Sequence, residues 1–147
     1  MLKGSPLIMT LIFFVTMLSC KKDKPEYSET PAITMVAVSS HDITEGDPLT
    51  FTISYVDGDG DLGENNPNVY NLFLVDNRVN VTYKFRIEQL APLNSSLIIK
   101  GNLNVVLNGT AITDGSNSQN ATYSLYVVDR AGHQSNTVVS PVVTIHR

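Results

Sequence analysis

The chain of 147 residues has no tryptophan and a single cysteine, Cys20. One cysteine excludes an intramolecular disulfide and any metal cage built from several thiolates. Charged residues make up only 16% of the chain, below the roughly one quarter that is usual in soluble domains. From Ala32 onward no segment has a sustained helical period of apolar residues, which argues against an α-helical domain.

Motifs of enzyme active sites are also scarce. Neither the nucleophile elbow Gly-x-Ser-x-Gly nor the zinc motif His-Glu-x-x-His is present. His41, His133 and His146 share no metal-binding spacing, and no two glutamates pair in the way that glycoside hydrolysis requires. We therefore predict that the protein is not an enzyme, and we keep a small hydrolase as an alternative.

The charge is negative and unevenly distributed. The formal net charge is −4, which argues against nucleic acid and against electrostatic docking onto anionic lipid. The stretch from Asp42 to Glu64 contains no Lys or Arg. Its seven acidic residues are Asp42, Glu45, Asp47, Asp57, Asp59, Asp61 and Glu64.

The N-terminal residues form the pattern of a secretory signal. Lys3 supplies a positive charge, and Leu7 to Leu18 is an uncharged apolar run of twelve residues. As a helix this run would reach about 18 Å, too short for a bilayer core of roughly 30 Å. Residues 1–19 are therefore predicted to be a signal peptide.

Cys20 lies directly after this run. The sequence Met17-Leu18-Ser19-Cys20 resembles a bacterial lipobox, although Met17 stands where leucine is usual. The resemblance implies that Cys20 is lipidated and anchors the protein to a membrane, here the bacterial outer membrane, facing the periplasm or the cell surface. Several acyl chains hold a protein more firmly than one. Residues 20–31, which contain Pro25 and Pro31, are expected to form a flexible tether.

Residues 32–147 are expected to form one β domain. Apolar and polar residues alternate in short runs separated by turn residues, as in half-buried strands. Seven to nine strands are predicted, at residues 33–38, 49–56, 69–75, 80–88, 97–100, 103–107, 122–128 and 137–145. The runs 97–100 and 103–107 are either two short strands interrupted by Gly101 or one long bent strand. Pro141 in the last run implies an edge position or a bulge. The predicted fold is an all-β, immunoglobulin-like antiparallel β-sandwich.

A run of alternating aspartate and glycine follows the second predicted strand. Asp57, Asp59 and Asp61 place three carboxylates on a flexible backbone, and Ca²⁺ prefers six to eight oxygen ligands. The loop is not an EF-hand, because Leu62 replaces the required glycine and Asn68 the required glutamate. The alternative is a solvated turn, since Asp-Gly pairs favour turns.

The predicted topology suggests a fourth ligand. In an immunoglobulin-like sandwich the turn that begins at Asp129 lies at the same end as the acidic loop. We therefore predict a Ca²⁺ site formed by Asp57, Asp59, Asp61 and Asp129, with Glu29 or Asn65 as additional candidates. For Asp129 the alternative is that its side chain caps its own turn.

One further motif carries a family resemblance. The stretch Val127-Val128-Asp129-Arg130-Ala131-Gly132-His133 resembles the final hairpin of bacterial Ig-like and cadherin-like domains. The whole chain is similar to small lipoproteins of the Bacteroidota, which implies an envelope location and this fold but no activity. The expected function is a lipid-anchored binding or structural module with an unidentified protein or glycan partner. The alternative is a carbohydrate-binding accessory protein, with Tyr70 and Tyr126 as candidate aromatic contacts.

Overall fold

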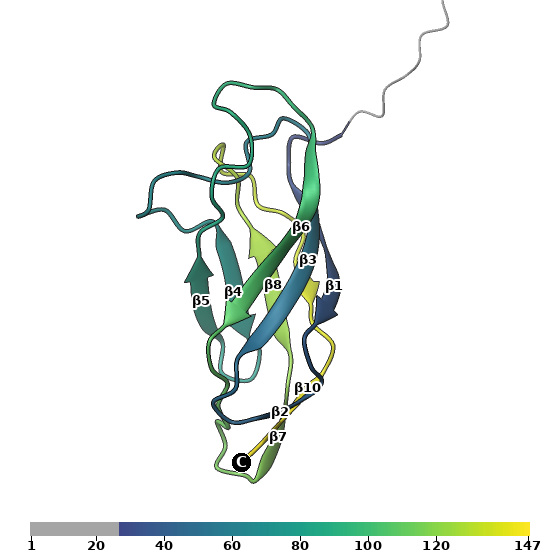
Figure 1. Cartoon of the computed structure of the whole chain (residues 1–147), viewed down its shortest axis with the longest axis vertical. Coiled ribbons are helices and arrows are strands. Elements are labelled where there is room, and N and C mark those ends of the chain that lie inside the picture. The colour runs from purple at the N-terminus through teal and green to yellow at the C-terminus, as the bar shows by residue number, and fades with distance from the viewer. Residues whose placement is uncertain (1–26) are drawn as a thin grey trace, which may run out of the picture.

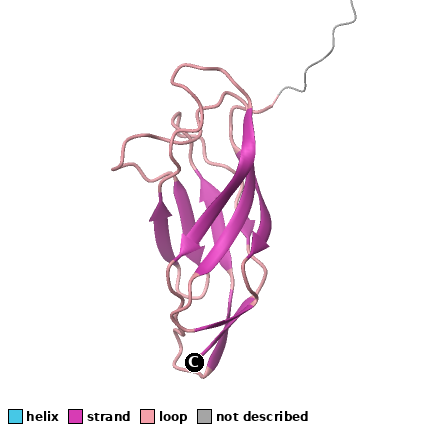
Figure 2. Ribbon diagram, viewed as in Figure 1, coloured by secondary structure: helices cyan, strands magenta, loops and turns pink. Residues whose placement is uncertain are grey.

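The computed structural model describes residues 27–147. The predicted signal peptide, the lipidation site at Cys20 and most of the predicted tether lie outside the described residues. Within residues 27–147 there is no helix, so none is long and apolar enough to cross a membrane (Figure 2).

The described chain is an all-β sandwich, as the alternation predicts. Its ten strands are β1 (Ala32–Val38), β2 (Asp42–Thr44), β3 (Leu49–Asp57), β4 (Leu72–Asp76), β5 (Val81–Phe85), β6 (Ile99–Leu107), β7 (Ser118–Ala121), β8 (Tyr123–Val127), β9 (Val138–Val139) and β10 (Val143–His146). The count exceeds the predicted seven to nine because the predicted last strand is divided into β9 and β10, and because two short strands form within a predicted turn and a predicted polar loop. These are β2 and β7, each of which buries a single apolar side chain, Ile43 or Ala121.

The strands form two main layers and one short sheet (Figure 1). One layer has the order β1-β3-β6, and the facing layer has the order β5-β4-β8-β9. The core lies between them, where alternate residues of β3 and β8 are buried. Phe51 and Tyr123 meet there edge to face, with ring centroids 5.1 Å apart.

Pro141 divides the predicted last strand into β9 and β10. The chain changes sheets at this point: β9 pairs with β8, whereas β10 pairs with β2 and β7 in the short sheet. Proline has no N–H to donate, so a continuous ladder ends here. The pairing of β10 with β2 is parallel, which departs from the antiparallel arrangement of the other pairs.

The sandwich has two distinct ends. The chain enters at the upper end in Figure 1, where β3 and β8 also finish, and the C-terminus lies at the lower end. The loops after β3 and β8 therefore lie at the end where the chain enters.

Candidate metal centre

The acidic loop begins inside the core. Asp57 is the last residue of β3, pairs with Ile99 of β6 and is fully buried. Its Oδ2 accepts a 2.9 Å hydrogen bond from the backbone N–H of Leu62. Leu62 is itself fully buried, so its apolar side chain anchors the loop to the core. The loop is thus folded back onto the end of the strand instead of extending into solvent.

Two glycines permit this compact loop. Gly60 and Gly63 have φ angles of +77° and +95°, a region that residues with a Cβ adopt rarely. A Cβ at Gly63 would also overlap the backbone carbonyl of Glu88, and one at Gly60 would overlap that of Leu97. A side chain at either position would therefore push the loop away from its neighbours.

Three carboxylates converge in this loop. Asp57, Asp59 and Asp61 each place one carboxylate oxygen within 4.8 Å of the others. The Oδ1 atom of each is buried and has no hydrogen-bond partner in the structure. A buried, unpaired acceptor costs about 1–3 kcal/mol, and more when it is charged. The arrangement therefore leaves three carboxylate oxygens without a partner. A cation bound between them would supply one.

Electrostatics at the cluster favours uptake of positive charge. Burial raises the pKa of Asp57 above its usual value, and the charges of Asp59 and Asp129 raise it further, against the lowering effect of the Leu62 N–H. Burial also raises the pKa of Asp61, and the charges of Asp129 and Asp59 raise it further. Asp57 and Asp61 thus bind protons more tightly than ordinary carboxylates do, and a divalent cation would compete with those protons.

Asp129 lies near the cluster but has a different role. Its side chain is fully buried, its Oδ1 accepts a 2.7 Å bond from the His133 N–H, and its Oδ2 lies 3.0 Å from His133 Nδ1. Asp129 therefore caps its own turn, which was the alternative interpretation. Its negative charge still acts on Asp57 and Asp61.

The two additional candidates are placed differently. Asn65 donates from Nδ2 to Gln89 Oε1 at 2.7 Å and is exposed. Glu29 is also exposed and lines a polar hollow of about 570 Å³ together with His133. Glu29 is not among the acidic residues that the structure brings together, and the Asn65 side chain is engaged by Gln89.

The turn after β8 holds the acidic loop in place. Arg130 donates from Nη1 to the Gly63 carbonyl at 2.7 Å, and the Ala131 N–H donates to Asp61 Oδ2 at 3.0 Å. Sequence reasoning missed Arg130, because nothing in its local sequence distinguishes it from an exposed arginine. The expectation that these two loops meet at one end of the sandwich is confirmed by these contacts.

The glycines of the loop also have the spacing Gly58-x-Gly60-x-x-Gly63. In dinucleotide-binding folds this spacing precedes a helix whose N-terminus holds a pyrophosphate. Here no helix follows the loop, and the loop carries three carboxylates, which would repel a phosphate. The loop therefore suits a cation and repels a nucleotide.

The other candidate residues do not assemble into a site. His146 pairs with Asp42 on the surface, and His41 contacts the Val142 carbonyl. Tyr126 stacks on Phe73 with ring centroids 4.9 Å apart and planes 13° apart, so one face of its ring is covered. Tyr70 is exposed but has no aromatic partner among the described contacts.

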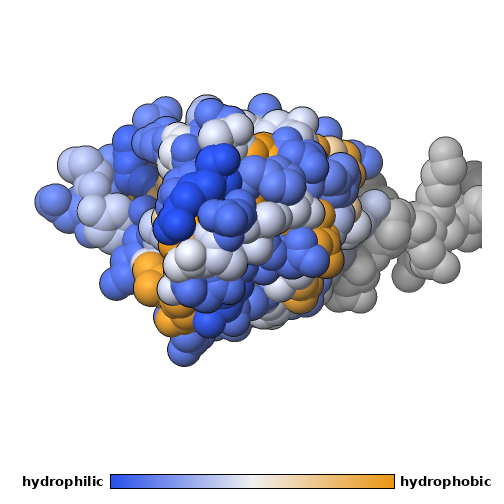
Figure 3. Space-filling model, turned by 90° about the horizontal axis from the view of Figure 1, so that it is seen from below, coloured by the Kyte–Doolittle hydropathy of each residue, from blue (hydrophilic) through white to orange (hydrophobic). Residues whose placement is uncertain are grey.

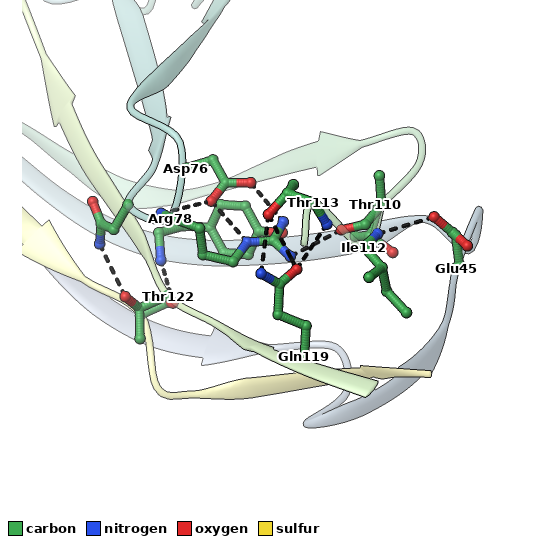
Figure 4. Close-up of polar contacts among 12 residues, drawn as sticks. Glu45, Asp76, Arg78, Thr110, Ile112, Thr113, Gln119 and Thr122 are labelled. Carbon is green, nitrogen blue, oxygen red and sulfur yellow. Dashed lines mark hydrogen bonds and ion pairs between the residues drawn. The ribbon is translucent and has the colours of Figure 1, made fainter. Parts of the chain in front are cut away.

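The opposite end of the sandwich carries a buried polar network centred on Arg78, beside the buried Tyr123 hydroxyl, which has no hydrogen-bond partner within residues 27–147 (Figure 4). Arg78 Nη2 lies 2.6 Å from Asp76 Oδ2, and the two side chains are only 10% and 4% exposed. Arg78 Nη1 also donates to the Ala111 carbonyl and to Gln119 Oε1. Burial raises the pKa of the adjoining Tyr123 to about 12, which keeps its hydroxyl protonated. This network ties the loop before β7 to the β4–β5 turn and is structural.

The surface at this lower end is mostly hydrophilic, with hydrophobic side chains scattered near its rim (Figure 3).

Comparison of the chain with protein-family models, curated proteins and solved structures gave no match. The acidic loop is therefore the feature on which a functional proposal can be built.

Proposed function

We propose that the protein is a lipid-anchored module of the bacterial cell envelope, stabilised by a divalent cation, Ca²⁺, at its acidic loop. It binds a protein or glycan partner or has a structural role at the outer membrane, and it catalyses no reaction. The apolar N-terminal run that ends at Cys20 supports the anchor. The observation that carries the cation is the set of three buried, unpaired Oδ1 atoms of Asp57, Asp59 and Asp61.

The choice of Ca²⁺ follows from the chemistry of the donors. All three side chains offer hard oxygen ligands, and within residues 27–147 no histidine belongs to the cluster. Because Asp57 and Asp61 each have Oδ2 engaged by a backbone N–H, each has one oxygen left for the metal. Water or backbone carbonyls would complete the six to eight ligands that Ca²⁺ prefers, whereas Mg²⁺ demands a stricter octahedron.

Calorimetry and thermal melting of the chain in CaCl₂ and in EDTA test the cation. A dissociation constant of about 10⁻⁴ to 10⁻³ M is expected, as in other extracellular modules, together with a higher melting temperature in Ca²⁺. Asp59→Asn should weaken binding strongly. Asp47→Asn is the matched control, because the Asp47 side chain is exposed and accepts a hydrogen bond from the Thr44 N–H, which the asparagine oxygen can also accept. A melting temperature that does not change in millimolar Ca²⁺ would refute the proposed site.

A pull-down from envelope extracts, with and without Ca²⁺, tests the binding role. A partner retained by the wild type and lost in EDTA would tie the cation to binding. A partner retained equally in both conditions would make the cation purely structural.

A further inference from the structure

The segment through which the chain enters the domain is packed directly on the acidic loop. The Gly58 N–H donates to the Ser28 carbonyl at 2.9 Å. A Cβ added at Gly58 would overlap the backbone carbonyls of both Ser28 and Tyr27. Glycine is therefore required at this position by the close approach of the entering segment, and not by a left-handed φ angle.

The peptide that holds the segment lies between two candidate ligands. Gly58 is flanked by Asp57 and Asp59, whose unpaired oxygens belong to the cluster. Without a cation, repulsion between these two carboxylates acts on the backbone that carries the bond to Ser28. A cation would draw them together and fix this backbone.

The rest of the entering strand is held independently of the cluster. Pro31 is fully buried. The Ile33 N–H donates to Asn136 Oδ1 at 2.9 Å, and Asn136 Nδ2 donates to the Ile33 carbonyl at 2.8 Å. Any release of the entering segment is therefore confined to residues 27–30, with Pro31 as the pivot.

We propose that the cation at the acidic loop is a latch that docks residues 27–30 onto the sandwich. This proposal rests on the proposed cation site and adds its regulatory consequence. With the cation bound, Ser28 stays on Gly58 and residues 27–30 have a fixed position on the domain. When the cation is lost, residues 27–30 detach and the domain swings about Pro31. The coupling is reciprocal, so docking of the segment strengthens cation binding by the same factor.

Cleavage by a glutamate-specific protease measures the docking directly, since Glu29 is exposed within the segment. Proteases need a locally detached chain, so cleavage tracks the open population. For the full chain in detergent we expect Ca²⁺ to slow cleavage at Glu29 at least about fivefold relative to Glu45. Glu45 lies at the opposite end, where its Oε1 accepts a bond from the Ile112 N–H, and it corrects for global stabilisation.

Amide hydrogen exchange provides a second measurement. Protection of the Gly58 amide should rise at least about fivefold in Ca²⁺, while that of the Ile33 amide beyond the pivot should not change. Unchanged cleavage at Glu29 and unchanged exchange at Gly58, with Ca²⁺ binding detected by calorimetry, would overturn the latch and leave the proposed function intact. Absence of Ca²⁺ binding in calorimetry would remove the proposed site and the latch together.

A substitution tests the reciprocity. Gly58→Ala should displace the segment and lower Ca²⁺ affinity at least about fivefold. Gly109→Ala is the matched control, because neither glycine has a positive φ and a Cβ at Gly109 would meet only the Gly46 carbonyl, at an ordinary 3.5 Å. Wild-type Ca²⁺ affinity in Gly58→Ala would refute the coupling.

Discussion

Replacement of Asp57 by asparagine should raise the stability of the protein in EDTA and remove most of the stability that Ca²⁺ adds. Asparagine keeps the shape of the side chain and an oxygen that can accept the bond from the Leu62 N–H. It removes one negative charge from a group of three whose facing oxygens lie within 4.8 Å of one another. At that separation two unit charges repel by about 0.9 kcal/mol in water and by about 3.5 kcal/mol at an effective dielectric constant of 20.

The net effect in EDTA is smaller than the sum of these repulsions. Asp59 and Asp61 are partly exposed, so solvent screens part of the repulsion. We expect Asp57→Asn to raise the free energy of unfolding in EDTA at pH 7.5 by about 1 to 3 kcal/mol. In 5 mM CaCl₂, a dissociation constant of about 10⁻⁴ M would raise the free energy of unfolding of the wild type by about 2.3 kcal/mol. The variant should lose most of this increase.

The assay is urea unfolding followed by circular dichroism in both buffers. Asp114→Asn is the control, because Asp114 is an exposed aspartate at the other end of the sandwich that accepts a bond from the Ser116 N–H. It should behave like the wild type in both buffers. If Asp57→Asn lowers stability in EDTA as much as in Ca²⁺, the unpaired oxygens carry no repulsion and the argument for a cation site fails.

The remaining predictions concern pH, the polar network and the anchor. In EDTA, the stability that Asp57 and Asp61 contribute should fall as pH rises above about 3.8, the ordinary pKa of aspartate. Their pKa values are raised, so the folded chain keeps protons that the unfolded chain has already lost. Urea midpoints that are flat or rising above this pH would contradict the prediction. Arg78→Met should lower the free energy of unfolding, measured by thermal unfolding, by about 3–5 kcal/mol, because the Asp76 charge is left buried and unpaired. Adding Asp76→Asn in the same chain should recover part of this loss. A cost below about 1 kcal/mol would show that the pair is not buried in solution. Cys20→Ser should abolish incorporation of labelled palmitate and release the protein from the membrane fraction, whereas a variant that stays membrane-bound would refute the lipid anchor.

Local pattern was sufficient to predict the core strands. Every second residue of the sequence is apolar from Leu49 to Ile53 in β3 and from Tyr123 to Val127 in β8. The structure buries these apolar side chains, Phe51 and Leu125 among them. The period of two is a property of the extended backbone itself, so it survives any tertiary arrangement. The same reasoning failed for β2 and β7, because each of these strands depends on pairing with β10, which lies far away in the sequence.

The acidic site was predicted in part. Asp57, Asp59 and Asp61 converge as expected from their spacing, since alternation with glycine keeps them within a few residues of one another. The role of Asp129 depended on whether its oxygens faced the cluster or its own turn, and only the position of His133 decided this. The hydrogen bond from Arg130 to the Gly63 carbonyl could not be predicted, because the two residues are 67 positions apart in the sequence.

The sequence by itself determined that this is an all-β domain with a concentrated acidic loop, because alternation and Asp-Gly spacing are local properties of the chain. The signal peptide predicted at residues 1–19 and the lipid anchor predicted at Cys20 likewise depend on the sequence alone. Only the tertiary structure decided which oxygens are buried without partners and which segment lies on Gly58. Those features arise where residues 27–30, 57–64 and 129–136 meet at one end of the sandwich, and such long-range packing depends on how the sheets close around the core.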